Sequence, residues 1–281
     1  MKKRDKRMTH KKWGAVVAYG ALIIVSFIYL FPCLWIILSS FSKSGSLFTF
    51  HGFFPEEYAL TTYKNLFFDV TKYNYPMWFR NTLFIATMTC IISTFLVILT
   101  AYTFSKFRFK TKKAMMKTTM VLGMFPSFMG MIAIYILMTQ FNLVNHMWGL
   151  ILFYSAVAPM GYLTQKGFFD TLPGAVDEAA RIDGATNFQI FWKINMPMSK
   201  PILVYTALAS FTTPWSDYIL PKLLLKEKNL YTVAVGLMTL DENEFARFAA
   251  GSVVIAVPIV ILYMLLARHV IAGLSYGATK G

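Results

Sequence analysis

Residues 79–104 read FRNTLFIATMTCIISTFLVILTAYTF, and the only charged side chain in this stretch is Arg80, near its start. A helix needs about 20 consecutive apolar residues to cross the hydrocarbon core of a bilayer. Inside that core each backbone N–H and C=O must be paired within the segment, which a helix achieves. The stretch therefore predicts a transmembrane helix.

Similar apolar runs occur along most of the chain, and its composition agrees with them. Of the 281 residues, 57% are hydrophobic and 14% are charged, against about 45–50% and 25% in soluble domains. We therefore expect an all-α integral membrane protein with six transmembrane helices in a single domain, residues 13–272. Pro159 and Gly161 interrupt the fourth run. The five other runs are residues 13–38, 114–139, 147–165, 201–221 and 248–272.

The formal net charge of +14 is unevenly placed along the sequence. It lies in the basic tail 1–12, the connection after the second run, the connection 166–200 and the C-terminal end. In the other connections the numbers of basic and acidic residues are equal. By the positive-inside rule these segments face the cytoplasm, which predicts that both termini are cytoplasmic. The basic clusters adjoin helix ends without interleaved aromatic residues, which argues against a nucleic-acid partner.

The sequence lacks the residue patterns that catalysis, metal binding and ion-driven transport usually require. The four histidines are scattered, the two cysteines have no ligand partner near them in sequence, and no paired carboxylates lie within the apolar runs. We therefore expect no catalytic residue and no metal site. The runs also lack the chain of ionisable groups that ion-driven carriers use, and the sequence has no GxxxxGK[ST] phosphate-binding loop. The energy for any transport should come from another subunit.

The connection 166–200 differs from the rest of the chain. Pro173 suits an early helical position and Gly184 suits the end of a helix. Asn187 offers an N-cap for a second short helix that stops before Pro197. Two short helices joined by a glycine turn should lie at the membrane surface, between the fourth and fifth spans. One interpretation is an amphipathic hairpin that only connects those spans.

The same residues resemble a known family. Glu178, Ala179 and Ala180, followed at fixed spacing by Gly184, Ile194 and Pro197, resemble the EAA motif of ABC-importer permeases, EAA-x3-G-x9-I-x-L-P. Met196 stands where the family usually has Leu, a swap that conserves volume. In this family the motif marks cytoplasmic coupling helices. Three further stretches resemble carbohydrate importers: residues 81–83, 101–109 and 273–281. A fourth, residues 231–237, resembles the smaller permease of maltose and maltodextrin importers.

The resemblance implies a function and a set of partners. The chain would form half of a sugar pathway, most closely for malto-oligosaccharides, in the bacterial cytoplasmic membrane. It would pair with a second permease, two ATPase subunits that bind ATP and Mg, and an extracytoplasmic sugar-binding protein, and would itself be neither an enzyme nor a cofactor carrier. The alternative is a secondary transporter, or another multi-pass membrane protein, that ATP does not drive.

Roles for the motif residues also follow from the resemblance. Glu178 would make polar contacts with an ATPase subunit, Ala179 and Ala180 would allow close approach, and Gly184 would form the turn. Asp183 either caps the helix or pairs across the interface. Ile194 and Pro197 would complete the coupling segment.

Two further groups of residues are weaker candidates. Trp215, Asp217 and Tyr218 lie near the end of the fifth run and are candidates to line the sugar path. A membrane-interface belt suits the two aromatic residues better, so Asp217 is the stronger candidate. In the C-terminal tail 273–281, the residues Gly277, Lys280 and Gly281 either reach the ATPase subunits or form a frayed end. The connection 222–247 either contacts the binding protein or is solvated.

Overall fold

The structure is a computed structural model that describes residues 2–43, 54–55, 57–125 and 127–278, and the side chains of these except 2–14, 127, 159 and 268–278. The described residues contain helices and one isolated β-bridge, Ser42–Tyr58, but no strand. The chain divides into two compact units, residues 1–72 with 240–254 and residues 73–239 with 255–281.

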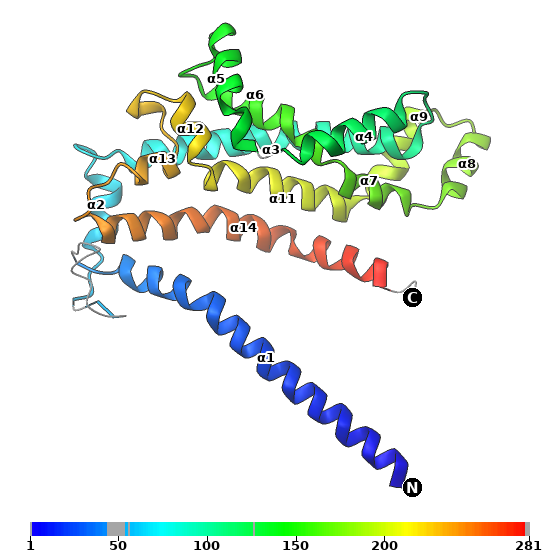
Figure 1. The fold of residues 1–281 in the computed structure, drawn as a ribbon, viewed down its shortest axis with the longest axis horizontal. Helices are drawn as coiled ribbons and strands as arrows, with labels where there is room; N and C mark the ends of the chain where they lie inside the picture. The colour runs from blue at the N-terminus through cyan, green and yellow to red at the C-terminus, as the bar shows by residue number, and fades with distance from the viewer. Residues whose placement is uncertain (1, 44–53, 56, 126, 279–281) are drawn as a thin grey trace. The chain divides into compact units, whose positions relative to one another are not determined.

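The helices follow one another along the whole chain (Figure 1). The larger ones are α1 Lys2–Ser40, α2 Thr61–Phe68, α3 Tyr75–Lys106, α4 Lys112–Gly123, α5 Met131–Gln140, α6 Met147–Val157, α7 Leu163–Asp170, α8 Gly174–Ile182, α11 Lys200–Ser216 and α14 Phe245–Ala278. The shorter ones are η1 Ser127–Gly130, η2 Ala158–Gly161, α9 Asn187–Gln189, η3 Ile190–Asn195, α10 Met196–Met198, α12 Ile219–Leu224, η4 Lys228–Leu230 and α13 Val233–Leu237.

Among the described residues, three helical segments are long and apolar enough to cross a membrane. They are Ala15–Ser40, Tyr75–Lys106 and Phe245–Ala267, which contain most of the first, second and sixth predicted runs. A fourth span is possible if the bent pair Lys112–Gly123 and Phe128–Gln140 counts as one. This is fewer than the six helices that the sequence predicts.

The remaining runs form shorter helices for local reasons. The third run bends by 89° between its two helices, and the first of them, α4, ends at Gly123, a residue type disfavoured inside helices. In the fourth run α6 ends at Val157 and the 3₁₀-helix η2 takes over, as expected from Pro159 and Gly161. The fifth run forms α11, 17 residues long.

The unit of residues 1–72 and 240–254 is held together by polar contacts. Thr62 Oγ1 donates to Ser42 O at 2.6 Å. Arg247, whose side chain is buried, reaches Asp69 Oδ2 and Glu244 Oε2, each at 3.3 Å. Arg247 thus links α14 to the residue that follows α2.

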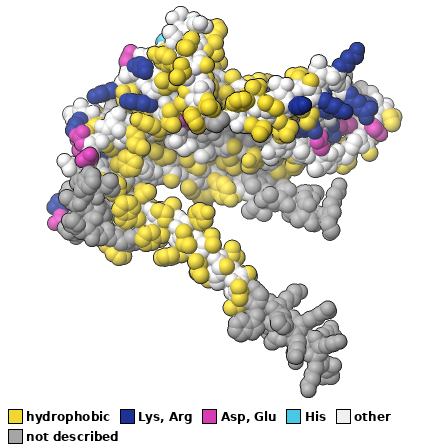
Figure 2. Space-filling view, in the orientation of Figure 1, with side chains coloured by type: hydrophobic (Ala, Val, Ile, Leu, Met, Phe, Trp, Pro, Cys, Tyr) yellow, Lys and Arg dark blue, Asp and Glu magenta, His cyan; other side chains and the backbone are white. Residues whose placement is uncertain are grey.

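The second unit is organised around α3, which packs along α11 and also contacts α6 and α7. In Figure 1, α8 and α9 lie at one end of this pair of helices, and α12 and α13 lie at the other. On the face shown in Figure 2, Lys and Arg side chains lie over the end that holds α4, α8 and α9 and also over the opposite end. We call the end of α3 and α11 that holds α8 and α9 the α8 end, and the end that holds α12 and α13 the α13 end.

Candidate functional site

The α8 end contains the EAA residues, and its first helix has clear start and stop signals. Pro173 is the N-cap residue of α8, and Asp177 lies in the first turn, where a carboxylate favours the positive end of the helix dipole. At the other end, Gly184 N donates to Arg181 O at 3.1 Å and Ala185 N to Ala180 O at 2.9 Å. This pair of bonds is a Schellman motif.

Gly184 has the backbone conformation that this cap requires. Its φ is +83°, and it is the only positive-φ glycine among the described residues. Any side chain would be strained there by the backbone angle alone. It would not clash, because no other atom lies within 4 Å of the position that a Cβ would take. Asp183 is the C-cap residue of α8 and is exposed.

The second short helix begins one residue earlier than the sequence predicts. Its N-cap is Thr186, whose Oγ1 accepts from Gln189 N at 3.3 Å, while Thr186 N donates to Gln189 Oε1 at 2.8 Å. This reciprocal pair is a capping box. The prediction that Asn187 caps the helix is therefore wrong, because Gln189 stands three residues after Thr186.

The sequence also predicts that this second helix stops before Pro197, but in the structure it does not. It continues as the π-helix η3, which contains Ile194, and then as α10, which contains Pro197. Pro197 has no N–H to donate to a carbonyl in the preceding turn. A π-turn before it changes the hydrogen-bond register, so that the chain continues towards α11.

A buried ion pair ties α8 to α3. Lys106 Nζ lies 3.1 Å from Asp177 Oδ2, and their side chains are only 14% and 10% exposed. Asn195 Nδ2, from η3, donates to Asp177 Oδ1 at 2.9 Å. Asn195 Nδ2 also lies 3.5 Å from the Tyr102 hydroxyl oxygen on α3. We call Tyr102, Lys106, Asp177 and Asn195 the polar node.

Apolar packing reinforces the polar node. The Phe191 ring of η3 lies 4.7 Å from the Tyr102 ring and belongs to a buried cluster with residues of α3, α7 and α11. Ala180 of the EAA motif is buried, as are Ile190 and Phe191. The α8 end is therefore fixed to the main helices through one face of each short helix.

The opposite face of the α8 end is exposed and apolar. Ile182 is 87% exposed and Phe188 is 71% exposed, and Trp192 lies beside Phe188 with ring centroids 6.2 Å apart. Glu178 and Ala179 are exposed on the same segment. Rigidly held apolar side chains of this size are typical of a surface that binds a partner.

A further carboxylate at this end is well paired. Lys166 Nζ and Ser105 Oγ each donate to Asp170 at 2.6 Å. Partial burial raises the pKa of Asp170, but these hydrogen bonds and the charges of Lys166 and Lys112 outweigh it, so the pKa lies below its usual value. Asp170 is therefore held in its charged form.

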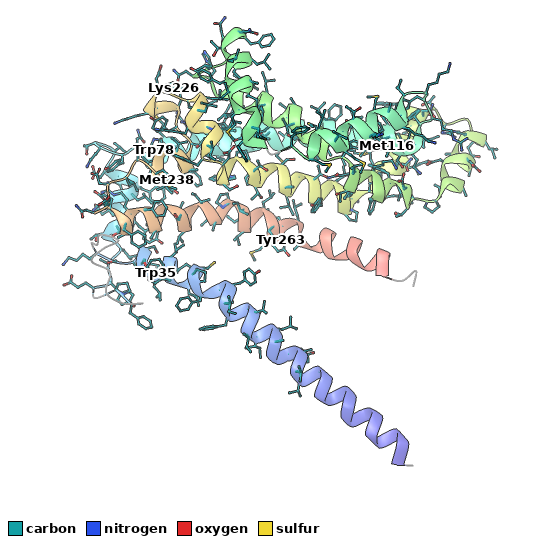
Figure 3. All side chains as sticks on the ribbon, viewed as in Figure 1. Trp35, Trp78, Met116, Lys226, Met238 and Tyr263 are labelled. Carbon is teal, nitrogen blue, oxygen red and sulfur yellow. The ribbon has the colours of Figure 1, made fainter. Side chains whose placement is uncertain are left out.

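At the α13 end, two of the stretches that resemble carbohydrate importers, residues 81–83 and 231–237, meet. Asn81 Nδ2 donates to Asn229 O at 2.7 Å and to Tyr231 O at 3.1 Å, and Thr82 Oγ1 accepts from Val233 N at 2.8 Å. A Cβ at Gly236 would lie 2.1 Å from the Trp78 ring; Figure 3 labels Trp78 on α3 close to α13. Residues 81–83 and 231–237 thus form one closely packed contact.

The structure separates the three predicted sugar-path residues. Trp215 is 2% exposed and packs against the rings of Phe79 and Phe211. Asp217 lines a cavity, and its Oδ2 accepts from Tyr154 Oη at 2.8 Å. Tyr218 is exposed and does not line that cavity.

In the predicted C-terminal tail, Gly277 lies within α14, while Lys280 and Gly281 lie outside the described residues.

The sequence pattern does not single out the residues of the polar node as a group. Asp177 directly precedes the EAA motif and Lys106 lies within the resembling stretch 101–109, so both positions carried a signal. Neither their contact nor the part played by Asn195 follows from sequence spacing, because these residues meet only in the folded chain.

Comparison with known proteins identifies the family. Residues 93–276 match the family described as "Binding-protein-dependent transport system inner membrane component". The chain belongs to this family, which confirms the prediction from the EAA motif.

Individual relatives agree over nearly the whole chain. The maltodextrin transport system permease protein MalD of Streptococcus pneumoniae is 36% identical, over 94% of this chain and 95% of that protein. The galactooligosaccharides transport system permease protein GanQ of Bacillus subtilis is 34% identical, with the same coverage. The fold is similar to a chain of a bacterial ABC transporter for the acidic polysaccharide alginate, with a TM-score of 0.76 at 22% identity, over 90% of this chain and 95% of that one.

Proposed function

We propose that this chain is the transmembrane permease subunit of a sugar importer, and that it couples to ATPase subunits through residues 166–200. The observation that carries the proposal is the exposed apolar face at the α8 end, with Ile182 and Phe188 on segments that the polar node fixes to α3. A surface of this kind can receive a movement from a partner and pass it to a long helix. Glu178, Ala179, Asp183 and Gly184 lie on the exposed side of the same segment.

The proposed partners follow from the family. Two ATPase subunits, which bind ATP and Mg, contact the α8 end. A second permease completes the translocation pathway, and an extracytoplasmic binding protein delivers the sugar. The chain itself carries no cofactor in this proposal, and its C-terminal residues Gly277, Lys280 and Gly281 reach towards the ATPase subunits.

The proposed topology has six spans with both termini in the cytoplasm of a bacterium. It is supported by the six apolar runs and by the positive charge of the alternate connections. The bent α4–α5 pair, α6 with its continuation, and α11 then cross the membrane together with the three longer helices.

The proposed substrate is a malto-oligosaccharide. Relatives named for maltodextrin transport, including MalD, support it. The relative named for galactooligosaccharides makes a different neutral sugar the natural comparison in any uptake assay.

Affinity purification of the tagged chain from bacterial membranes tests the assembly. We expect an ATPase subunit and a second permease to co-purify, and proteoliposomes of the complex to take up maltotriose only with ATP and the binding protein. Uptake without ATP would instead indicate a secondary transporter.

The variant Ala180→Glu tests the role of the α8 end. It places a bulky charge at a buried position and should uncouple ATP hydrolysis from uptake without preventing membrane insertion. The matched control is Gly167→Ala on α7, where a Cβ meets no atom within 4 Å. Uptake by Ala180→Glu at the control's rate would contradict the proposed coupling.

A further inference from the structure

An apolar groove lies beside the α8 end of the second unit. Its volume is about 330 Å³, within the range of about 300–1,000 Å³ that is typical of ligand pockets. Side chains of α3, η3, α10 and α11 form its wall. The groove therefore lies between the long helix α3 and the segment that carries the α8 end into α11.

The wall of the groove offers a ligand few hydrogen bonds. Apart from the indole of Trp192, its polar side chains among the described residues are Cys90 and Thr94. Cys90 Sγ already donates to Ala207 O at 3.4 Å, and Thr94 Oγ1 is buried and does not open into the groove. A sugar or a nucleotide would leave its polar groups unpaired here, which disfavours binding. The groove therefore suits a hydrocarbon chain.

The groove is open along one side. Its rim includes Ile91 and Phe95 of α3, which are 60% and 51% exposed, and Trp192 of η3, which is 44% exposed. Ile91 and Phe95 are four residues apart and so share a face of α3. Since α3 is apolar and long enough to cross a membrane, this face of the groove is accessible to lipid.

Two lysines lie on the walls of the groove at the α8 end. Lys200 is three and seven residues before Leu203 and Ala207, so these three share a face of α11, and Lys193 lies in η3. Both lysines are exposed, and neither is within 4 Å of a carboxylate among the described residues. Residues 186–200 contain no acidic residue. This end of the groove therefore attracts an anion.

The groove and the lysines have the spacing of the two parts of a phospholipid. At 1.5 Å per residue, Ala207 lies about 10 Å along α11 from Lys200, and the hydrocarbon of one leaflet is about 15 Å thick. A lipid with its headgroup at Lys200 would place an acyl chain along Leu203 and Ala207. Trp192 suits the boundary between headgroup and hydrocarbon, where tryptophan is enriched.

We propose that this groove binds an acyl chain of an anionic phospholipid from the cytoplasmic leaflet, and that Lys193 and Lys200 pair with its headgroup. The proposal rests on the proposed topology, in which the α8 end is cytoplasmic, and it goes beyond the proposed function because the ligand is not the transported sugar. An apolar helix of a partner would fill the groove without pairing the two lysines, so the charge favours the lipid. The bound lipid fills the space between η3 and α3.

Quenching of Trp192 fluorescence by brominated phospholipids tests the site in the full complex in nanodiscs. Bromine on an acyl chain quenches a tryptophan that it contacts. The chain has six tryptophans, so the signal of Trp192 is the difference between wild type and Trp192→Phe. Half-maximal quenching should need about fivefold less brominated phosphatidylglycerol than brominated phosphatidylcholine, as expected for one lysine that attracts an anionic headgroup.

Variants of the lysines and of the groove separate the two parts of the site. Lys193→Gln with Lys200→Gln should remove the preference for phosphatidylglycerol and leave the complex assembled, because both side chains are exposed. Lys228→Gln, at an exposed lysine of the α13 end, is the matched control. Ala207→Phe fills the groove and should reduce quenching by both lipids, whereas Ala133→Phe, at an exposed position on α5, should not.

Three results would overturn the proposed lipid site. They are equal quenching by the two lipids in the wild type, a preference that survives in the double lysine variant, and no quenching of Trp192 by either lipid, which would show that a protein segment covers the groove. ATP-dependent maltotriose uptake is measured separately in proteoliposomes of the same complex. Its absence in the wild type would overturn the proposed function, whatever the quenching shows.

Discussion

The two ends of α3 meet their neighbours in different ways. At the α13 end, Asn81 and Thr82 bond to the backbone around α13, and Gly236 lies directly against Trp78. At the α8 end, the polar node buries one face of the short helices but leaves Ile182 and Phe188 exposed. At the α13 end this chain packs closely on Trp78, whereas in the proposed function the α8 end is the surface that a partner contacts. In the proposed function, the α8 end is the one that changes its contacts during transport.

The largest expected effect comes from breaking the polar node. Asp177→Asn leaves the mostly buried Lys106 without its counter-charge, and the cost of removing one partner of a buried pair is about 3–5 kcal/mol. We expect a lower thermal midpoint of the purified complex and loss of coupling between ATP hydrolysis and uptake.

A double-mutant cycle separates the pair from general damage. The double variant Lys106→Met with Asp177→Asn removes both charges and should be more stable than the sum of the single changes. Additive losses would show that the two residues do not act together.

Gly184→Pro should have the next largest effect. Proline fixes φ near −65° and removes the N–H that donates to Arg181 O, so the Schellman motif cannot form, at a cost of about 3 kcal/mol. Uptake should fall at least tenfold, with insertion unchanged. Gly184→Asn is the matched control, because Asn tolerates positive φ. Equal uptake by the two variants would show that the turn at Gly184 plays no part in transport.

At the α13 end, Gly236→Ala should destabilise the chain by about 1–3 kcal/mol, because the added Cβ overlaps the Trp78 ring. The ratio of ATP hydrolysed to sugar transported should stay at its wild-type value in the complexes that assemble. Gly123→Ala is the control for the thermal midpoint of unfolding, because a Cβ added at Gly123 would lie in open space. A changed coupling ratio in Gly236→Ala would contradict the contrast between the ends.

Phe188→Ser should change the stability of the chain by less than about 0.5 kcal/mol, because the side chain is exposed. The amount of ATPase subunit that co-purifies should nevertheless fall several-fold. Phe68→Ser, at a comparably exposed residue outside the α8 end, is the matched control. Normal retention of the ATPase in Phe188→Ser would remove Phe188 from the proposed contact.

The smallest effect concerns Asp170. Its pKa is lower in the folded chain than in the unfolded one, so its contribution to stability is present above the unfolded pKa, near 3.9, and is lost as pH falls through the folded pKa. The difference in thermal midpoint between wild type and Asp170→Asn should be constant above about pH 5 and shrink below about pH 4. A difference that is the same at all pH values would show that ionisation of Asp170 plays no part.

Different parts of this fold follow from the sequence to different degrees. The helices around 13–38, 79–104 and 248–272 follow from long apolar runs, and the end of α8 follows from Gly184. The capping box was missed because it depends on the pair Thr186 and Gln189, and the π-helix because a proline alone predicts a stop. The polar node and the cavity depend on side chains far apart in the sequence, which local patterns do not relate.

The continuity of α3 has a mechanical consequence. Between Asn81 at one end and Lys106 at the other, the helix contains no proline, and at 1.5 Å per residue the two lie about 38 Å apart. A stiff rod of this length works as a lever. A tilt of about 5° around the α13 end would carry Lys106 through about 3 Å, the scale of a side chain. In the proposed coupling, a small closing motion in a partner would therefore be enough to open or shut a path beside the helix.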